Sequence, residues 1–400
     1  MDHILEEVCK LVYSRRSALE ISEVGVGCYS LSGVYGAKDR DEYARMIRRA
    51  YDLGVTFFDT APAYGDAEEF VGRVARGFRD DVCIATKVGV AQEGAQFDLS
   101  PRSIHASCEM SLERLGTDYI DLYQVHFDDG RTPTDEVVAA MESLRDAGKI
   151  REWGVCHLPA AKISEYCRTG KPFSVLMELS AVARSSREDL LPVLREYDVA
   201  GIAFSTTGRG ILTGSIRPGY TFPESDLRSY DPLFQREQFE SALRVADRMG
   251  QVARDHGKTP AQAAIAWTLG QPGIVCALTG PSRVAHLEEN LGAVGWRIPR
   301  ENIDGLERLF QEEDEWIEGQ RRESVSSILK TPVRSSSHKA FADLVYVLEM
   351  SVLLGLADEQ AIIPIFQRLC KLRGGTGEDV MREMDTIRQE VAMMLPGGSA

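Results

Sequence analysis

Four ionisable side chains stand at the ends of three short apolar segments. They are Asp59 and Tyr64 in FFDTAPAYG, Lys87 in CIATKVG and His126 in YIDLYQVHFDD. Each segment is rich in Val, Ile, Phe and Tyr, which is typical of a buried strand, and a helical pattern follows each one. In a barrel of alternating strands and helices, the carboxyl ends of the strands form one mouth that carries the chemistry. We therefore expect the four side chains to converge on one pocket.

These four residue types could together move a proton to a carbonyl oxygen. A tyrosine phenol with an ordinary pKa of about 10 is a poor proton donor at neutral pH. An ammonium such as that of Lys87 lowers this pKa, and a carboxylate such as Asp59 keeps the ammonium charged and oriented. His126 could bond a substrate oxygen or assist proton transfer. The alternative is a structural Asp59–Lys87 pair, with Tyr64 and His126 as ordinary pocket residues.

The elements that must position these residues alternate along the chain. Alternating strands and helices are typical of a closed (β/α)8 barrel, although an open doubly wound sheet has the same local pattern. The predicted strands are Glu23–Val26, Val55–Phe58, Val82–Thr86, Tyr119–Val125, Ile150–Val155, Ser174–Met177, Val199–Phe204 and Ile274–Leu278. The predicted helices are Asp41–Leu53, Ala67–Arg76, Pro101–Leu115, Thr134–Ala147, Ala160–Arg168, Arg187–Tyr197, Gln238–His256, Pro260–Leu269 and Arg300–Trp316.

Composition excludes several classes of partner. The net charge of −15 and the acidic pI argue against a nucleic-acid ligand, because a phosphate backbone favours a basic surface. No apolar run approaches the roughly 20 residues of a membrane span, so no membrane partner is expected. The eight cysteines contain no C-x-x-C pair, which favours a reducing, cytoplasmic compartment and no metal site. The acidic, amphipathic MDHILEEVCKLVY predicts a short helix rather than a secretory signal.

Six stretches in order along the chain resemble the aldo-keto reductase family. They are GVTFFDTAPAYG, IATKVG, SLERLGTDYIDLYQVH, LRDAGKIREWGV, GRGILTG and HLEENLGA, and the resemblance runs from about Ser17 to Phe310. It implies a (β/α)8 TIM barrel that reduces an aldehyde or ketone with NADPH. It also implies that Asp59, Tyr64, Lys87 and His126 form the catalytic tetrad, with Tyr64 as the proton donor.

Two glycine-containing loops are the candidates for holding that cofactor. Gly208–Gly214 follows the seventh predicted strand, and its backbone N–H groups could hold the pyrophosphate, although a plain turn is the alternative. After the eighth strand, Gly280 turns the chain into a helix whose N-terminus favours phosphate. The resemblance implies that Arg283 and His286 hold the 2′-phosphate, while a solvated surface arginine is the alternative for Arg283. The predicted cofactor-binding residues are Gly27, Cys156, His157, Phe204, Ser205, Gly210, Leu212, Gly280, Ser282, Arg283, His286, Glu289 and Asn290, the last two for the adenine.

The sequence departs from the family at the nicotinamide carboxamide. Cys156 and His157 replace the usual Ser-Asn, and Leu176 stands where a Gln is usual. Ser205 is followed by two threonines instead of Pro-Leu, but Phe204 could still stack on the nicotinamide. These departures leave two alternatives to carbonyl reduction. One is non-redox proton chemistry by the same tetrad, such as dehydration or epimerisation, and the other is a non-enzymatic regulatory subunit.

A helical extension is expected after the barrel. We predict a barrel over residues 1–322, then a linker and helical extension over residues 323–400. The linker is Thr331–His338, and the helices are Ala340–Leu356, Asp358–Leu372 and Glu378–Leu395. Their broad apolar stripe must be buried against the barrel, over its mouth, or in a homo-oligomer.

Overall fold

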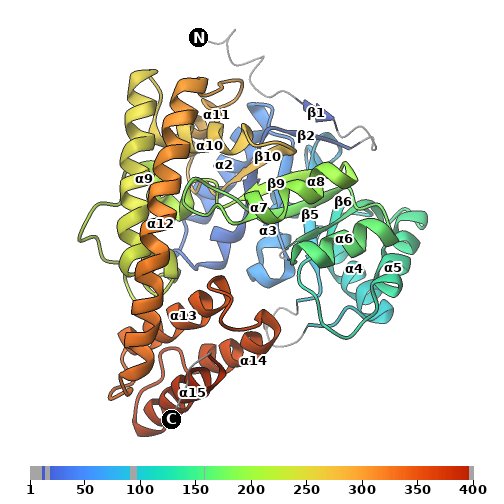
Figure 1. Ribbon diagram of the computed structural model, residues 1–400. Coiled ribbons are helices and arrows are strands. Elements are labelled where there is room, and N and C mark those ends of the chain that lie inside the picture. Colours follow the sequence, from blue (N-terminus) through green and yellow to red (C-terminus); the bar gives the residue numbers. More distant parts are fainter. Residues whose placement is uncertain (1–10, 14–18, 91–96, 157, 396–400) are drawn as a thin grey trace. The chain divides into compact units, whose positions relative to one another are not determined.

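Eight parallel strands close into a barrel in the computed structural model, which describes residues 11–13, 19–90, 97–156 and 158–395 (Figure 1). The strands follow one another around the barrel in chain order, and the last pairs with the first, which excludes the open sheet. They are β3 (Val24–Gly27), β4 (Phe57–Asp59), β5 (Cys83–Val88), β6 (Ile120–Val125), β7 (Ile150–Cys156), β8 (Ser174–Glu178), β9 (Ala200–Phe204) and β10 (Ile274–Thr279). The predicted (β/α)8 fold is confirmed.

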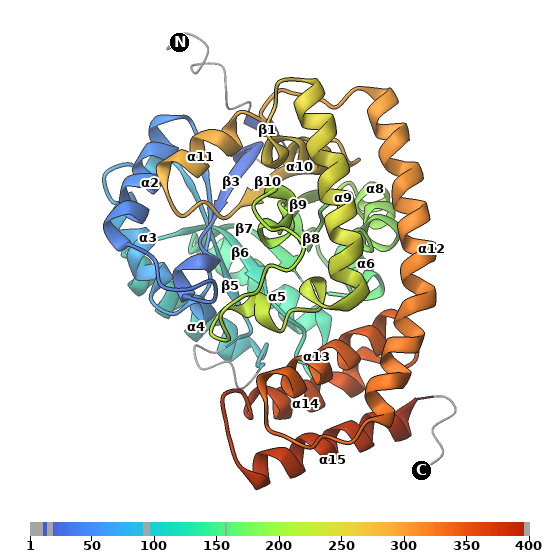
Figure 2. The ribbon, with the colours of Figure 1, turned by 90° about the vertical axis from the view of Figure 1, so that its left-hand side faces the viewer.

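The connecting helices surround the strands (Figure 2). They are α2 (Arg40–Asp52), α3 (Ala67–Ala75), α4 (Pro101–Leu115), α5 (Thr134–Asp146), α6 (Ala160–Thr169), α7 (Ser186–Asp189), α8 (Leu191–Tyr197), α10 (Pro260–Leu269) and α11 (Val284–Leu291). In α2, Tyr43, Met46, Ile47 and Ala50 are buried at the i, i+3, i+4, i+7 spacing of one helix face. The Asp39 carboxylate caps this helix by accepting the first-turn N–H groups.

The chain before the barrel contains a small antiparallel pair. β1 (Leu11–Tyr13) pairs with β2 (Glu20–Ser22), with Val12 opposite Ile21. The helix predicted for this segment is therefore wrong over Leu11 and Val12, and its other apolar positions lie outside the described residues. A few apolar residues fit either periodicity, and here a second strand supplies the hydrogen bonds that decide the outcome.

The barrel interior is a buried apolar layer beneath the mouth. Its cluster contains Leu19, Ile21, Phe57, Cys83, Ala85, Leu122, Cys156, Phe173, Leu176, Ile202, Cys276 and Leu278. Gly25 is required here, because an added Cβ would lie 2.8 Å from side-chain carbons of both Leu278 and Phe57. Because this layer is closely packed, it supports the polar residues at the mouth and restricts their movement.

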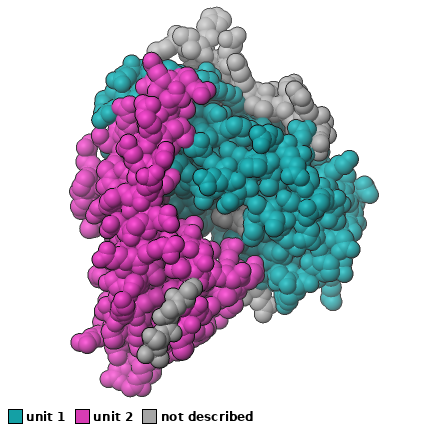
Figure 3. Space-filling model, viewed as in Figure 1, with its two compact units in different colours: residues 1–215, 249–299 teal, residues 216–248, 300–400 magenta. Residues whose placement is uncertain are grey.

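The chain divides into two compact units, which are coloured separately in Figure 3. The first comprises residues 1–215 and 249–299 and contains the barrel strands. The second comprises residues 216–248 and 300–400 and contains the first part of α9 (Arg236–Asp255) with the C-terminal helices. These are α12 (Arg300–Lys330), α13 (His338–Leu353), α14 (Glu359–Cys370) and α15 (Glu378–Met394).

The three predicted C-terminal helices are present, but the helix before them is longer than predicted. It continues past Trp316 to Lys330. Its polar middle, QEEDEWIEGQRRES, suggested an end, whereas Val325, Ile328 and Leu329 resume the apolar stripe and are buried. They join a core formed with side chains of α13, α14 and α15. The long helix is therefore stabilised by packing at its C-terminal end.

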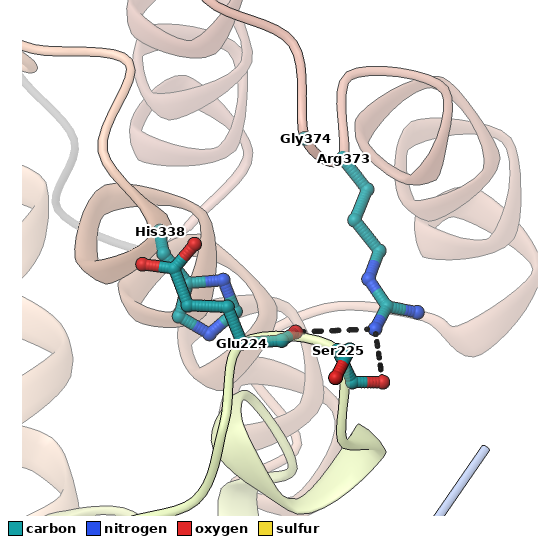
Figure 4. Close-up of a pocket in the computed structure, with 5 residues that line it drawn as sticks. All are labelled: Glu224, Ser225, His338, Arg373 and Gly374. Atoms are coloured by element: carbon teal, nitrogen blue, oxygen red, sulfur yellow. Dashed lines mark hydrogen bonds between the residues drawn. The ribbon is translucent and has the colours of Figure 1, made fainter. Parts of the chain in front are cut away.

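A pocket of about 460 Å³ lies within the second unit (Figure 4). Arg373, in the turn after α14, donates to the Tyr230 hydroxyl (2.8 Å) and to the backbone carbonyls of Glu224 (3.4 Å) and Ser225 (3.3 Å). His338, at the start of α13, lines the same pocket. These bonds join the C-terminal helices to the loop before α9, so the extension and this loop form one packed body.

Candidate active site

A buried ion pair lies at the centre of the predicted tetrad. Asp59 is the last residue of β4, and Lys87 is the penultimate residue of β5, the neighbouring strand. The Lys87 ammonium lies 2.6 Å from Asp59 Oδ1 and donates to the Thr60 carbonyl at 2.8 Å. Only 4% of Asp59 and 1% of Lys87 is exposed. Burial opposes the charge of Lys87, but Asp59 and then Tyr64 hold its pKa above the ordinary value, so the ammonium stays charged.

The second oxygen of Asp59 is also held. Gln124 Nε2 donates to Asp59 Oδ2 at 3.1 Å, and both side chains are buried. Sequence analysis did not select Gln124. A signal was available in the sequence. Gln124 lies in β6, two residues before His126, and side chains two residues apart along a strand point to the same side. Asp59 therefore meets two donors, one on each oxygen.

Tyr64 lies next to this pair. It ends a short 3₁₀ turn, η2 (Pro62–Tyr64), that follows β4, and Pro62 fixes the backbone at its start. Its ring centre lies 4.9 Å from the Lys87 nitrogen. Burial raises the pKa of the Tyr64 phenol, and the lowering by Lys87 does not offset it. The net direction is opposite to that expected from the lysine alone, so the phenol keeps its proton at neutral pH.

His126 completes the group. It is buried directly after β6, with its ring centre 6.3 Å from that of Tyr64. Its backbone N–H donates to the Val88 carbonyl at 2.8 Å, which fixes the position of the residue. The Cys156 thiol donates to the carbonyls of Val125 and His126, both at 3.2 Å. Burial raises the pKa of this thiol, so Cys156 remains a neutral donor that supports the backbone of His126.

A continuous series of ring contacts passes through the tetrad. Successive ring centres are between 4.6 and 6.3 Å apart. The series runs Tyr35, Tyr29, Tyr64, His126, Phe127 and Phe97. Its members follow β3, β4 and β6 or lie in the loop before α4, and Tyr29 is partly exposed. One side of the mouth therefore offers aromatic surface next to the phenol of Tyr64.

Two glycines at the ends of β3 and β10 leave the backbone open to close contact with a ligand. A Cβ added to Gly27 would lie 3.6 Å from the Thr279 carbonyl oxygen, and one added to Gly280 would lie 4.0 Å from the Gly27 carbonyl oxygen. Side chains at either position would narrow this gap between the two strands. Both glycines were predicted as cofactor-binding residues, and their placement fits backbone contact with a ligand.

Positively charged groups gather near the start of α11. Partial burial, and then the charges of Arg283 and Lys38, lower the pKa of His286. Lys38 was missed by sequence analysis, because it lies far away in the chain, in the loop before α2. A carboxylate also lies at the N-terminus of α11, because the Val284 N–H donates to Glu42 Oε1 at 3.2 Å. Ser282 precedes this helix and Glu289 and Asn290 lie within it, with Asn290 buried.

The loop after β9 uses its backbone N–H groups internally. Gly208 donates to the Ser205 carbonyl at 2.7 Å, while Gly210 and Leu212 both donate to the Thr207 carbonyl at 3.1 Å. The expectation that these N–H groups hold a pyrophosphate stays a prediction, and it would require them to exchange partners.

The carboxamide end of the predicted cofactor site is apolar. Cys156 and Leu176 are register neighbours at the ends of β7 and β8, and both belong to the buried interior cluster. The Cys156 thiol is already bonded to backbone carbonyls, and the Leu176 side chain has no polar atom. These two residues do not fit a carboxamide. Phe204, the last residue of β9, packs against the same cluster, and His157 lies outside the described residues.

Comparison with known proteins defines the class to which this fold and site belong. The model of the aldo/keto reductase family matches residues 23–310. Aldo-keto reductase YhdN of Bacillus subtilis is 34% identical over 303 residues, covering 74% of this chain and 92% of the relative. Aldo-keto reductase yakc [NADP(+)] of Schizosaccharomyces pombe is 32% identical over 285 residues, covering 68% of this chain and 84% of the relative. The chain belongs to the aldo/keto reductase family, and it is an oxidoreductase.

Solved structures agree with this assignment. The glycerol dehydrogenase AKR11B4 of Gluconobacter oxydans matches with a TM-score of 0.70 and 29% identity, covering 76% of this chain and 95% of that one. The holo form of aldo-keto reductase AKR11C1 of Bacillus halodurans matches with a TM-score of 0.64 and 26% identity, covering 75% and 96%. No helix in the described part of the chain is both long enough and apolar enough to cross a membrane.

Proposed function

We propose that this protein reduces an aldehyde or a ketone to an alcohol with NADPH, and that Tyr64 donates the proton. The observation that carries this proposal is the neutral, partly buried phenol of Tyr64 next to the Lys87–Asp59 pair. A raised pKa keeps the proton on Tyr64 until a stronger base forms beside it. The alkoxide produced by carbonyl reduction is such a base.

Each tetrad residue then has a separate task. When bound, the nicotinamide would supply the hydride. Tyr64 gives its proton to the developing alkoxide, and the Lys87 ammonium stabilises the phenolate that remains. Asp59 keeps Lys87 charged and directed at the phenol. His126 bonds the carbonyl oxygen and holds it within reach of Tyr64.

The choice of NADPH rests on the positive charge near α11. Arg283, His286 and Lys38 together would meet the 2′-phosphate, and Gly27 and Gly280 would allow close approach of the backbone. The name of the fission-yeast relative includes NADP(+), which agrees with this choice. Phe204 would cover one face of the nicotinamide, while its carboxamide would lack partners at Cys156 and Leu176.

The aromatic series indicates the substrate class. A substrate with its carbonyl at Tyr64 and His126 would extend along Tyr29 or Phe127. Flat apolar groups gain most from such rings. We therefore expect aromatic aldehydes to be better substrates than short polyhydroxy aldehydes.

The test is NADPH consumption with a panel that includes benzaldehyde and glyceraldehyde. Tyr64→Phe should abolish most of the activity with every substrate, because losing a general acid typically costs about 10²–10⁴ in rate. Tyr51→Phe is the matched control, since the Tyr51 hydroxyl bonds Asp81 on the outer helices instead. Turnover of Tyr64→Phe within threefold of the parent would remove Tyr64 as proton donor.

The same panel distinguishes the non-redox alternative, which the apolar surface at Cys156 and Leu176 keeps open. A tetrad that dehydrates or epimerises its substrate would change the product spectrum without consuming NADPH. A parent protein that consumes no NADPH with any carbonyl would therefore contradict the proposed reduction. Product analysis by NMR of the same reactions would then decide between a non-redox enzyme and a non-enzymatic subunit.

A further inference from the structure

The pocket in the second compact unit contains polar groups that the barrel chemistry does not use. Its volume of about 460 Å³ is within the range of about 300–1,000 Å³ that is typical of small-molecule sites. The residues that line it are Glu224, Ser225, His338, Arg373 and Gly374 (Figure 4). The first two lie in the loop before α9, and the other three come from α13 and the turn after α14. All five belong to the second unit, so the pocket is formed within one packed body.

Arg373 brings to this pocket a positive charge that no carboxylate neutralises. Its guanidinium donates to the Tyr230 hydroxyl at 2.8 Å and to the backbone carbonyls of Glu224 and Ser225 at 3.4 and 3.3 Å. Its Cζ also lies 4.4 Å from the centre of the Tyr230 ring. These partners are all neutral, and Arg373 makes no ion pair with any described residue. The contacts therefore hold the guanidinium at the pocket and leave its charge available to a ligand.

Glu224 supplies the opposite charge, but it does not pair with Arg373. The Glu224 side chain is exposed and has neither an ion pair nor a hydrogen bond in the described part of the chain. Figure 4 shows its carboxylate and the Arg373 guanidinium on opposite sides of the pocket. A simple anion would be repelled by Glu224, and a simple cation would be repelled by Arg373. The ligand that complements both groups carries one charge of each sign.

Two neutral groups of the pocket also lack partners. The Nε2 atom of His338 is buried and makes no hydrogen bond with any described residue. A buried polar atom without a partner is unfavourable, so a ligand that bonds to it gains stability. The Ser225 hydroxyl likewise has no partner among the residues that the structure describes. An ammonium can donate to the imidazole nitrogen, and a carboxylate can accept from the hydroxyl.

We propose that this pocket binds a small zwitterion of the amino-acid class. The ligand carboxylate is held by Arg373 and by the Ser225 hydroxyl. The ligand ammonium is held by the Glu224 carboxylate and by His338 Nε2. This inference concerns the second unit alone and does not depend on the proposed carbonyl reduction. The alternative is that Glu224 and Arg373 are solvated surface charges and that the pocket contains only water.

Binding to the full-length protein is measured by isothermal titration with ligands that differ only in the distance between their two charges. The series is glycine, β-alanine and γ-aminobutyrate. The member that binds most tightly is then compared with its analogue that lacks the ammonium and its analogue that lacks the carboxylate; for γ-aminobutyrate these are butyrate and butylamine. We expect each analogue to bind at least about tenfold more weakly, as for the loss of a charge-assisted hydrogen bond.

Two substitutions assign the binding to this pocket. Glu224→Gln removes the negative charge without breaking a side-chain bond of the protein. It should weaken the tightest zwitterion at least about tenfold, and it should not weaken the analogue that has only a carboxylate. Arg373→Gln should weaken both of these ligands, and its amide can still donate to Tyr230. Glu312→Gln is the matched control and should change neither affinity, because Glu312 is an exposed residue of α12 that does not line the pocket.

Three results would overturn the proposal. The first is that no member of the series binds. The second is that the carboxylate-only analogue and inorganic phosphate bind as tightly as the best zwitterion, since the pocket would then be an anion site. The third is an unchanged zwitterion affinity in Glu224→Gln. Thermal denaturation shows whether Arg373→Gln still folds, and if it does not, Glu224→Gln and the single-charge analogues decide the question.

Discussion

Replacing Gln124 by leucine tests whether the carboxylate of Asp59 must be held on both oxygens. Leucine has nearly the volume of glutamine, so no large cavity is expected. The variant loses the bond from Gln124 Nε2 to Asp59 Oδ2, and a hydrogen bond to a charged group contributes about 1.5–3 kcal/mol. It also removes Gln124 Oε1, a buried acceptor with no partner among the described residues, which costs about 1–3 kcal/mol when left unsatisfied. The two changes partly offset each other in the free energy of unfolding at neutral pH.

The same substitution should shift the acid limb of the pH–rate profile. Burial raises the pKa of Asp59, and Lys87 and Gln124 oppose that rise. Without Gln124 the pKa rises further, so Asp59 becomes protonated at a higher pH and releases Lys87 there. The lost bond contributes about 1.5–3 kcal/mol to the ionised form of Asp59, which is large enough to move the acid limb measurably towards neutral pH. Activity should therefore fall at a higher pH than in the parent.

The stability of the variant has a matching pH dependence. The folded pKa of Asp59 is above that of the unfolded chain, so the ionised carboxylate is a cost at neutral pH that disappears as the pH falls through the folded pKa. Gln124→Leu increases this cost at neutral pH and leaves the protonated form little affected. Relative to the parent, the variant should be least stable near neutral pH and should recover in acid.

The assay is kcat/KM against pH for the parent, Gln124→Leu and a control, with thermal denaturation at each pH. Gln271→Leu is the control, because Gln271 is also buried but donates to the Trp267 carbonyl in α10. It should lower stability without moving the acid limb. An unshifted acid limb in Gln124→Leu, with normal kcat, would refute the reasoning that Gln124 tunes Asp59.

Three further predictions concern other parts of the protein. Ending the chain after Ser335 should expose Val325, Ile328 and Leu329 to water. We expect the truncated protein to aggregate or to change its oligomeric state on sizing chromatography. Unchanged elution with full activity would show that the extension is an independent module. NADPH should bind more tightly than NADH in fluorescence titrations, and Arg283→Ala should remove about 1.5–3 kcal/mol of that preference; equal affinities that the variant leaves unchanged would exclude Arg283. Because the pKa of His286 is lowered, its protonation should strengthen NADPH binding as the pH falls below neutral, an effect that His286→Asn should abolish.

Periodicity was sufficient to predict the strands and helices, because the two differ clearly in their apolar spacing, but the choice of a closed barrel over an open sheet depended on the family resemblance. The eight predicted strands agree with the observed ones to within a few residues. The helix predicted over Arg187–Tyr197 is instead divided between α7 and α8. Pro192 explains the break, because it lacks an N–H and its ring crowds the preceding turn. The end of α12 was missed for the opposite reason, since tertiary packing of its last turns overrides a polar stretch.

The candidate site was predictable where chemistry depends on residues that follow strands, and not where it depends on partners distant in the chain. Asp59, Tyr64, Lys87 and His126 meet as expected, because parallel strands bring their carboxyl ends together. The raised pKa of Tyr64 could not be read from residue types, because burial decides its direction. Burial in turn depends on the packing of the whole mouth, which no single segment specifies.

The residues that sequence analysis missed share one property, which is that a spatial partner gives each its role. Gln124 matters through Asp59, and Lys38 matters through His286. None of these partners is adjacent in the sequence. A site assembled from strand ends is therefore predictable in its reacting groups, while the groups that orient them emerge only from the fold.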